Sequence, residues 1–170
     1  AGFAQAVASV NDASGKLVVF AIGQADGALY RLDATPTKLS GTQVLQTLSA
    51  GVDGAGQADA FATGVDQSLF KFDSQNGFFQ ADGPGNALAV RAVGGNWAIV
   101  LTPDGSVFSY NGLGNGQGAR FLIEGAGFGL GLDSVNLTSG DLVSDIVTTA
   151  HTVDQFDNGG LIALPGLTTL

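Results

Sequence analysis

The sequence predicts an all-β protein, built as a β-propeller-like array of about four blades that are each a four-stranded antiparallel sheet. One hairpin pattern carries this prediction. In residues 58–73, two short apolar strands flank a turn at residues 64–67, whose Gly and Asp tolerate the backbone angles of a tight hairpin. The same pattern recurs in residues 19–33 and 98–111. Its matched aromatic residues recur about 40 positions apart, which is a period typical of propeller blades: Tyr30, Phe70 and Phe108.

Each of the first three copies has the apolar segments needed for four strands. In the first copy we expect strands at residues 5–11, 16–22, 28–33 and 39–45, with residues 34–37 as a linker. In the second copy we expect strands at residues 47–52, in the hairpin of residues 58–73, and at 77–81. The third copy is predicted to hold strands at residues 87–93, 97–101, 106–111 and 120–124.

The fourth copy is degenerate. Its strands are predicted at residues 130–137, 142–149, 153–157 and 159–164. The segment of residues 139–150 is the one place where a helix would also fit the pattern. The whole chain is then a single repeat domain with blades at about residues 5–45, 45–85, 87–125 and 128–165.

Composition excludes several classes of function. The net charge is −9 with six Lys and Arg residues, which disfavours binding to nucleic-acid phosphates and to anionic membrane surfaces. No run of apolar residues is long enough for a transmembrane helix, and the chain has no cysteine. Because the sequence starts at Ala1 and contains no methionine, we expect a processed form or a part of a longer protein, with a secreted or cell-surface origin.

Four blades leave an open question about closure. A blade cannot bury its own apolar faces, so blades stack around an axis, and closed rings more often have five to eight of them. The array either closes as an unusual four-blade ring or leaves open edges. Open edges would pair with a second copy in a homo-oligomer, or with the remainder of a larger propeller chain.

The hairpins of residues 19–33 and 58–73 share the pattern hydrophobe-Phe-Ala-x-Gly, then Asp, then Leu-aromatic, and residues 48–57 precede the second hairpin. This pattern resembles the blades of bacterial tectonin-type propellers, including fucose-binding propeller lectins. The resemblance covers about residues 5–125. It implies a non-enzymatic propeller that recognises glycans or other surfaces. Sugar-binding blades of that kind generally carry tryptophans after the hairpin, whereas Trp97 precedes its hairpin here.

Residues 51–59 also resemble a degenerate calcium loop of integrin-type propeller repeats. Calcium takes six to eight oxygen ligands, and this loop offers the carboxylates of Asp53 and Asp59. Gly51 and Ala55 stand where further acids would be needed. A hairpin turn made of Gly and Asp is therefore the favoured interpretation, with Ca²⁺ binding as the alternative.

Residues next to the turns are the candidate ligand-binding residues. They are Arg31, Lys71 and Trp97, with Asp26, Asp66 and Asp104 at the matched turns. The repeated aromatic residues fit a core between blades better than a ligand-stacking set. His151, the one histidine, lacks the partners that a metal site or a catalytic pair needs.

The sequence therefore predicts a binding module without catalysis or cofactor. Glycan recognition at a cell surface or in the extracellular matrix is the first hypothesis, with an aromatic face for the sugar ring and polar groups for its hydroxyls. The alternative is a structural subunit that assembles through open blade edges into an oligomer or filament.

Overall fold

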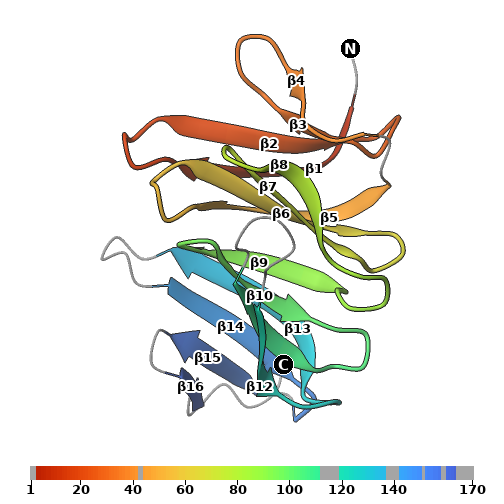
Figure 1. The fold of residues 1–170 in the computed structure, drawn as a ribbon. Helices are drawn as coiled ribbons and strands as arrows, with labels where there is room; N and C mark the ends of the chain where they lie inside the picture. Colours follow the sequence, from red (N-terminus) through yellow and green to blue (C-terminus); the bar gives the residue numbers. More distant parts are fainter. Residues whose placement is uncertain are drawn as a thin grey trace.

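The computed structural model describes residues 3–41, 44–111, 119–136, 142–150, 152–157 and 160–163. In these residues the chain forms four antiparallel sheets of four strands, and each strand pairs with the next one along the sequence (Figure 1). The described residues contain no helix. The predicted all-β array of four-stranded blades is confirmed.

The sheets follow one another along the chain as blades 1 to 4. Blade 1 consists of β1 (Ala4–Asn11), β2 (Leu17–Gly23), β3 (Leu29–Arg31) and β4 (Thr37–Lys38). Blade 2 consists of β5 (Leu45–Val52), β6 (Ala58–Gly64), β7 (Leu69–Asp73) and β8 (Gly77–Asp82). Blade 3 consists of β9 (Ala89–Gly94), β10 (Trp97–Leu101), β11 (Val107–Asn111) and β12 (Ala119–Glu124). Blade 4 consists of β13 (Gly129–Asn136), β14 (Leu142–Thr148), β15 (Val153–Asp157) and β16 (Gly160–Ala163).

The outer strand of blade 1 is the main correction to the predicted strands. It was expected at residues 39–45, but β4 is Thr37–Lys38, within and just after the expected linker. The strand ends there, because Ser40 Oγ takes the place of a backbone carbonyl: the Leu29 N–H donates to Ser40 Oγ at 2.8 Å, and the Leu39 N–H donates to the Leu29 carbonyl at 2.8 Å. The side chain of Leu39 packs against the core between blades 1 and 2 instead of extending a strand. A second correction concerns residues 142–148, where the structure has strand β14 and not a helix.

The blades stack through their innermost strands. Strands β1, β5, β9 and β13 contact one another in that order, and blades 1 and 4 lie at opposite ends of the molecule (Figure 1). The described residues of β13 make no comparable contact with β1, so the sheets do not close into a ring. One face of blade 1 and one face of blade 4 are therefore left without a neighbouring blade.

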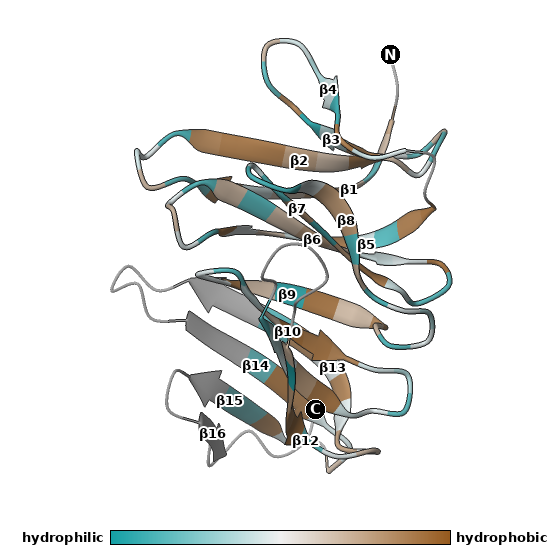
Figure 2. Ribbon diagram, in the orientation of Figure 1, coloured by the Kyte–Doolittle hydropathy of each residue, from teal (hydrophilic) through white to brown (hydrophobic). Residues whose placement is uncertain are grey.

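Three apolar cores, called joints here, hold neighbouring blades together, and the brown segments of Figure 2 mark much of them. Joint 1–2 contains Val18, Phe20, Ile22 and Leu29 of blade 1 with Ala58, Ala60, Ala62 and Phe70 of blade 2. Joint 2–3 contains Phe61 and Leu69 of blade 2 with Val90, Ala92, Ala98, Val100 and Tyr110 of blade 3. Joint 3–4 contains Ile99, Leu101 and Val107 of blade 3 with Leu132 and Ile146 of blade 4. Since successive side chains of a strand point to opposite faces of the sheet, blades 2 and 3 are buried on both faces.

The predicted hairpin turn of blade 2 is present. The Gly64 N–H donates to the Ser68 carbonyl at 2.9 Å, and Gln67 adopts the left-handed conformation with φ 63°. Among the described residues, no helix could cross a membrane.

Candidate functional site

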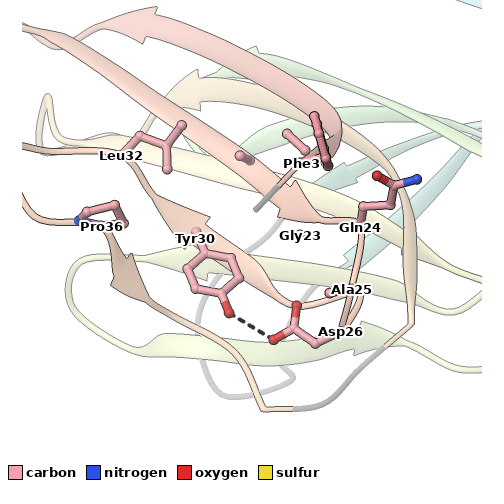
Figure 3. A pocket seen from close by; sticks show the side chains of 10 residues that line it. Phe3, Gly23, Gln24, Ala25, Asp26, Tyr30, Leu32 and Pro36 are labelled. Atoms are coloured by element: carbon pink, nitrogen blue, oxygen red, sulfur yellow. Dashed lines mark hydrogen bonds between the residues drawn. The ribbon is translucent and has the colours of Figure 1, made fainter. Parts of the chain in front are cut away.

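A pocket of about 430 Å³ opens on the uncovered face of blade 1 (Figure 3). It lies over β2 and β3 beside the turn of residues 24–27, and its wall is largely apolar. The lining side chains include Phe3, Ala21, Gln24, Tyr30, Leu32 and Pro36. Of the predicted ligand-binding residues, Asp26 is the one that lines this pocket.

Asp26 and Tyr30 form the polar corner of the pocket. Tyr30 Oη donates to Asp26 Oδ2 at 2.8 Å (Figure 3), and Lys38 Nζ donates to the same oxygen at 2.7 Å. The Lys38 hydrogen bond, followed by that of Tyr30, lowers the pKa of Asp26 to about 2. The hydrogen bond to Asp26 in turn raises the pKa of Tyr30. At neutral pH the Tyr30 phenol is therefore protonated, and its ring lies beside the ionised Asp26 carboxylate and the Lys38 ammonium group.

Asp26, Asp66 and Asp104 occupy the same position in blades 1, 2 and 3. Each Oδ1 accepts a hydrogen bond from the backbone N–H two residues later, which belongs to Ala28, Ser68 and Ser106 respectively. This local bond is the Asx turn that stabilises a tight hairpin. The predicted equivalence of the three turns is thus present in the structure, but the turns lie on different blades and do not converge on one site.

Two further predicted residues lie partly exposed and apart from the pocket wall. Arg31 Nε lies 3.0 Å from Asp33 Oδ2 in an ion pair. The Trp97 ring lies against that of Phe121, with centroids 5.9 Å apart. Ligand binding by Arg31 and Trp97 stays a prediction.

Lys71 lies inside joint 2–3, fully buried. Its Nζ donates to Asn96 Oδ1 at 2.7 Å, and it lies 3.6 Å from Asp73 Oδ2 and 3.7 Å from Asp59 Oδ2. The ammonium group also lies 5.4 Å from the centroid of the Phe61 ring. Ligand binding by Lys71 likewise stays untested, but its side chain does not face the solvent.

The loop of residues 51–59 forms a hairpin turn in which the two acids have different roles. Asp53 Oδ1 accepts hydrogen bonds from the N–H groups of Ala55 and Gln57, both at 2.8 Å. Asp59 faces the Lys71 ammonium, and burial, opposed by Lys71, raises its pKa to about 7. Within the described ranges, no three acidic, histidine or cysteine side chains are grouped as a metal site requires. His151 lies outside those ranges.

Gln24 and Lys38 are polar residues of the pocket region that sequence reasoning missed, and Lys38 is the one that binds Asp26. It pairs with Tyr30 across β3 and β4, which brings its Nζ to Asp26 and to within 5.8 Å of the Tyr30 ring centroid. The outer strand was expected to begin at residue 39, so this pairing could not be foreseen. An Asp, a Tyr and a Lys at positions 26, 30 and 38 become a signal only once the strand register is known.

By its fold and this site, the protein belongs to the class of open four-blade propellers, with a pocket on the face of a terminal blade. No family model matches the chain, and no curated protein matches it. Among solved structures, AofleA from Arthrobotrys oligospora is similar with a TM-score of 0.61 and 16% identity, over 96% of this chain and 57% of that one. The SapL1 lectin, solved in complex with alpha methyl fucoside, is similar with a TM-score of 0.59 and 13% identity, over 94% of this chain and 62% of that one.

The chain thus spans 57% and 62% of the length of these two structures. At these identities the similarity shows the fold. The resemblance to propeller lectins that the hairpin pattern indicates is therefore confirmed at the level of the fold.

Proposed function

We propose that this protein is a binding module that recognises carbohydrate through the pocket of blade 1. The observation that carries the proposal is the Tyr30 ring, set in an apolar wall beside the ionised Asp26 carboxylate. A sugar ring has an apolar face that packs on an aromatic side chain and hydroxyl groups that bind carboxylates and amides. The alpha methyl fucoside in the structure of the SapL1 lectin supports this ligand class.

The same geometry argues for binding without catalysis. A general acid or base works best with a pKa near the working pH. The pKa of Asp26 is lowered to about 2, and that of Tyr30 is raised, so neither group exchanges a proton readily near neutral pH. We further propose a secreted or cell-surface location, where glycans are abundant.

The test is to titrate the protein with alpha methyl fucoside and with each member of a glycan panel, and to measure the binding by calorimetry. Asp26→Asn keeps an oxygen for the turn but removes the charge from the pocket, so we expect about a tenfold loss of affinity. Asp66→Asn is the matched control, since it has the same role in its turn and does not line the pocket. Equal losses in both variants, or no binding of any glycan by the unaltered protein, would overturn the proposal.

A second function is favoured by the uncovered face of blade 1, namely that of a structural subunit that self-assembles. Apolar side chains stand in the solvent there, with exposed fractions of 80% for Phe3, 60% for Leu17 and 59% for Val7. Apolar patches of this kind mark interaction surfaces. Light scattering on a size-exclusion column tests this function, because a particle of 17.0 kDa would exclude assembly.

A further inference from the structure

The uncovered face of blade 1 matches, residue by residue, the face of blade 2 that blade 1 covers. Ala21 pairs with Tyr30 across β2 and β3, as Ala62 pairs with Phe70 across β6 and β7. Ala62 and Phe70 are buried under blade 1 in joint 1–2. The pocket beside Tyr30 therefore lies where a preceding blade would pack.

The matched glycines make the equivalence closer. A Cβ added to Gly23 would lie 2.6 Å from Asp26 Oδ1, and a Cβ added to Gly64 would lie 2.6 Å from Asp66 Oδ1. In both blades an atom of the aromatic ring, that of Tyr30 or Phe70, lies 3.0 Å from the added Cβ. The two faces thus have the same backbone and the same close packing, although one is covered and the other is open.

Blade 4 offers the complementary face at the other end of the molecule. The pair Val147 and Val153 on β14 and β15 stands at the position of Ile22 and Leu29, which blade 1 buries against blade 2. Val147 is 43% exposed, whereas Ile22 is fully buried. This outward face has its apolar pair in place, carries Asp145 where blade 1 has Phe20, and has no described blade against it.

We propose that a second copy of this chain docks the outward face of its blade 4 onto the uncovered face of blade 1. This contact repeats between chains the joint that the molecule forms three times within itself. It is heterologous, joining unlike faces as every internal joint does, so copies close into a ring or extend into a filament. The inference rests on the proposed assembly function and not on glycan binding. Docking covers the pocket beside Tyr30, as blade 1 covers Phe70 of blade 2.

A cross-linking experiment tests which faces meet. The chain has no cysteine, so Leu32→Cys marks the face of blade 1 and Asp145→Cys marks that of blade 4. Their counterparts in joint 1–2 are Phe72 and Phe20, whose ring centroids lie 6.0 Å apart. A short bis-maleimide should therefore join the two variants when they are mixed and should join neither variant alone. Cross-linking of Leu32→Cys alone, or no cross-linking in the mixture, would overturn the proposal.

The native mass gives an independent readout. Leu17→Glu on blade 1 and Val147→Glu on blade 4 each place a charge on an exposed position of one docking face, so each should reduce the particle to 17.0 kDa. Leu122→Glu on β12 is the matched control, since Leu122 is exposed on the outer strand of blade 3 and should leave the mass unchanged. An unaltered protein of 17.0 kDa would overturn the docking, whereas glycan affinity is measured separately and is not decided by either experiment.

Discussion

Joints 1–2 and 2–3 join blades of the same design and both have an apolar core, but joint 2–3 also holds a buried ion cluster. In joint 1–2 the buried residues are apolar, and Val18 fills the position that Asp59 holds in blade 2. In joint 2–3 the buried Asp59 faces the buried Lys71, with Asn96 of blade 3 binding the ammonium group. Asp59 and Lys71 of the buried cluster thus replace Val18 and the partly exposed Arg31, while the stacking of the blades is preserved.

The comparison teaches that the backbone of a blade sets how blades stack, and the side chains set how strictly two blades fit. A buried ion pair loses its hydration, so it is weak evidence for added stability. It is, however, directional. The β9–β10 turn places Asn96 in the left-handed conformation with φ 73°, and Gly95 of this turn donates to the Val52 carbonyl at 2.7 Å. We expect joint 2–3 to be intolerant of change and joint 1–2 to be tolerant.

The largest effect is expected for Lys71→Met. It removes the cation and leaves two buried acids, Asp59 and Asp73, without their counter-charge, so we expect a loss of about 3–5 kcal/mol in the free energy of unfolding. Denaturant unfolding measures this loss. Lys16→Met, on an exposed turn, is the control and should change stability by less than about 0.5 kcal/mol. A Lys71→Met protein as stable as the control would show that the ion cluster does not decide the fit of blades 2 and 3.

The next effect is a dependence of stability on pH. The pKa of Asp59 is about 7 in the folded protein against an ordinary value of 3.8, so the folded state holds its proton more tightly. The stability that this proton contributes is therefore fully present below pH 3.8. It is lost as the pH rises to about 7, at up to about 1.4 kcal/mol per pH unit. Asp59→Asn should flatten this part of the profile. A profile unchanged by the substitution would contradict the role of Asp59.

Other acids have the opposite effect, because their contribution to stability is lost at low pH. Hydrogen bonds lower the pKa values of Asp12, Asp26, Asp66 and Asp104. For Asp73, burial acts to raise the pKa, but the hydrogen bonds from Asn76 and the charge of Lys71 outweigh it and lower the pKa. Stability from these groups is present above their ordinary pKa of 3.8 and is lost as the pH falls below it. The free energy of unfolding should therefore be greatest at about pH 4–5.

A smaller effect is expected where the backbones of blades 2 and 3 approach each other. A Cβ added to Gly51 would lie 2.8 Å from Asp59 Oδ1 and 2.9 Å from the Ala92 Cβ. Gly51→Ala should therefore overpack joint 2–3 and lower the free energy of unfolding by about 1–3 kcal/mol. Gly131→Ala is the matched control, because an added Cβ there meets nothing within 4 Å. Equal stability of the two variants would show that joint 2–3 has room to adjust.

The repeat was the part of the fold that the sequence could predict, because alternating apolar residues and Gly-Asp turns are local signals. The burial of Lys71 was not predictable in this way. Alternation in Leu69-Phe70-Lys71-Phe72 places Lys71 opposite the two Phe rings, on a face that would be solvated in a single sheet. In a stacked blade that face is also covered. Asp59 and Asn96, which surround the Lys71 ammonium group together with Asp73, lie on the neighbouring strand and in the next blade.

The pocket shows the same limit from the other side. Asp26 was correctly placed at a turn, and Tyr30 was correctly matched to Phe70, but of these two aromatic residues Phe70 packs between blades as predicted and Tyr30 does not. In blade 1 no described blade covers Tyr30, so the same position becomes a pocket wall. Whether a repeated aromatic residue lies in a core or in a site depends on the neighbouring blade, and the local sequence does not encode that neighbour.

The smallest effect tests the tolerance expected of joint 1–2. Ile22 is fully buried there, and its counterpart in joint 2–3 is Thr63, whose Oγ1 lies 2.8 Å from Thr47 Oγ1. Ile22→Val removes one methylene group from an apolar contact that can partly close, so we expect a loss of about 0.5–1.5 kcal/mol by denaturant unfolding. Thr63→Val keeps the volume but leaves the Thr47 hydroxyl without this partner, and should cost about 1–3 kcal/mol. A larger loss for Ile22→Val than for Thr63→Val would reverse the comparison, because it would make the apolar joint the stricter of the two.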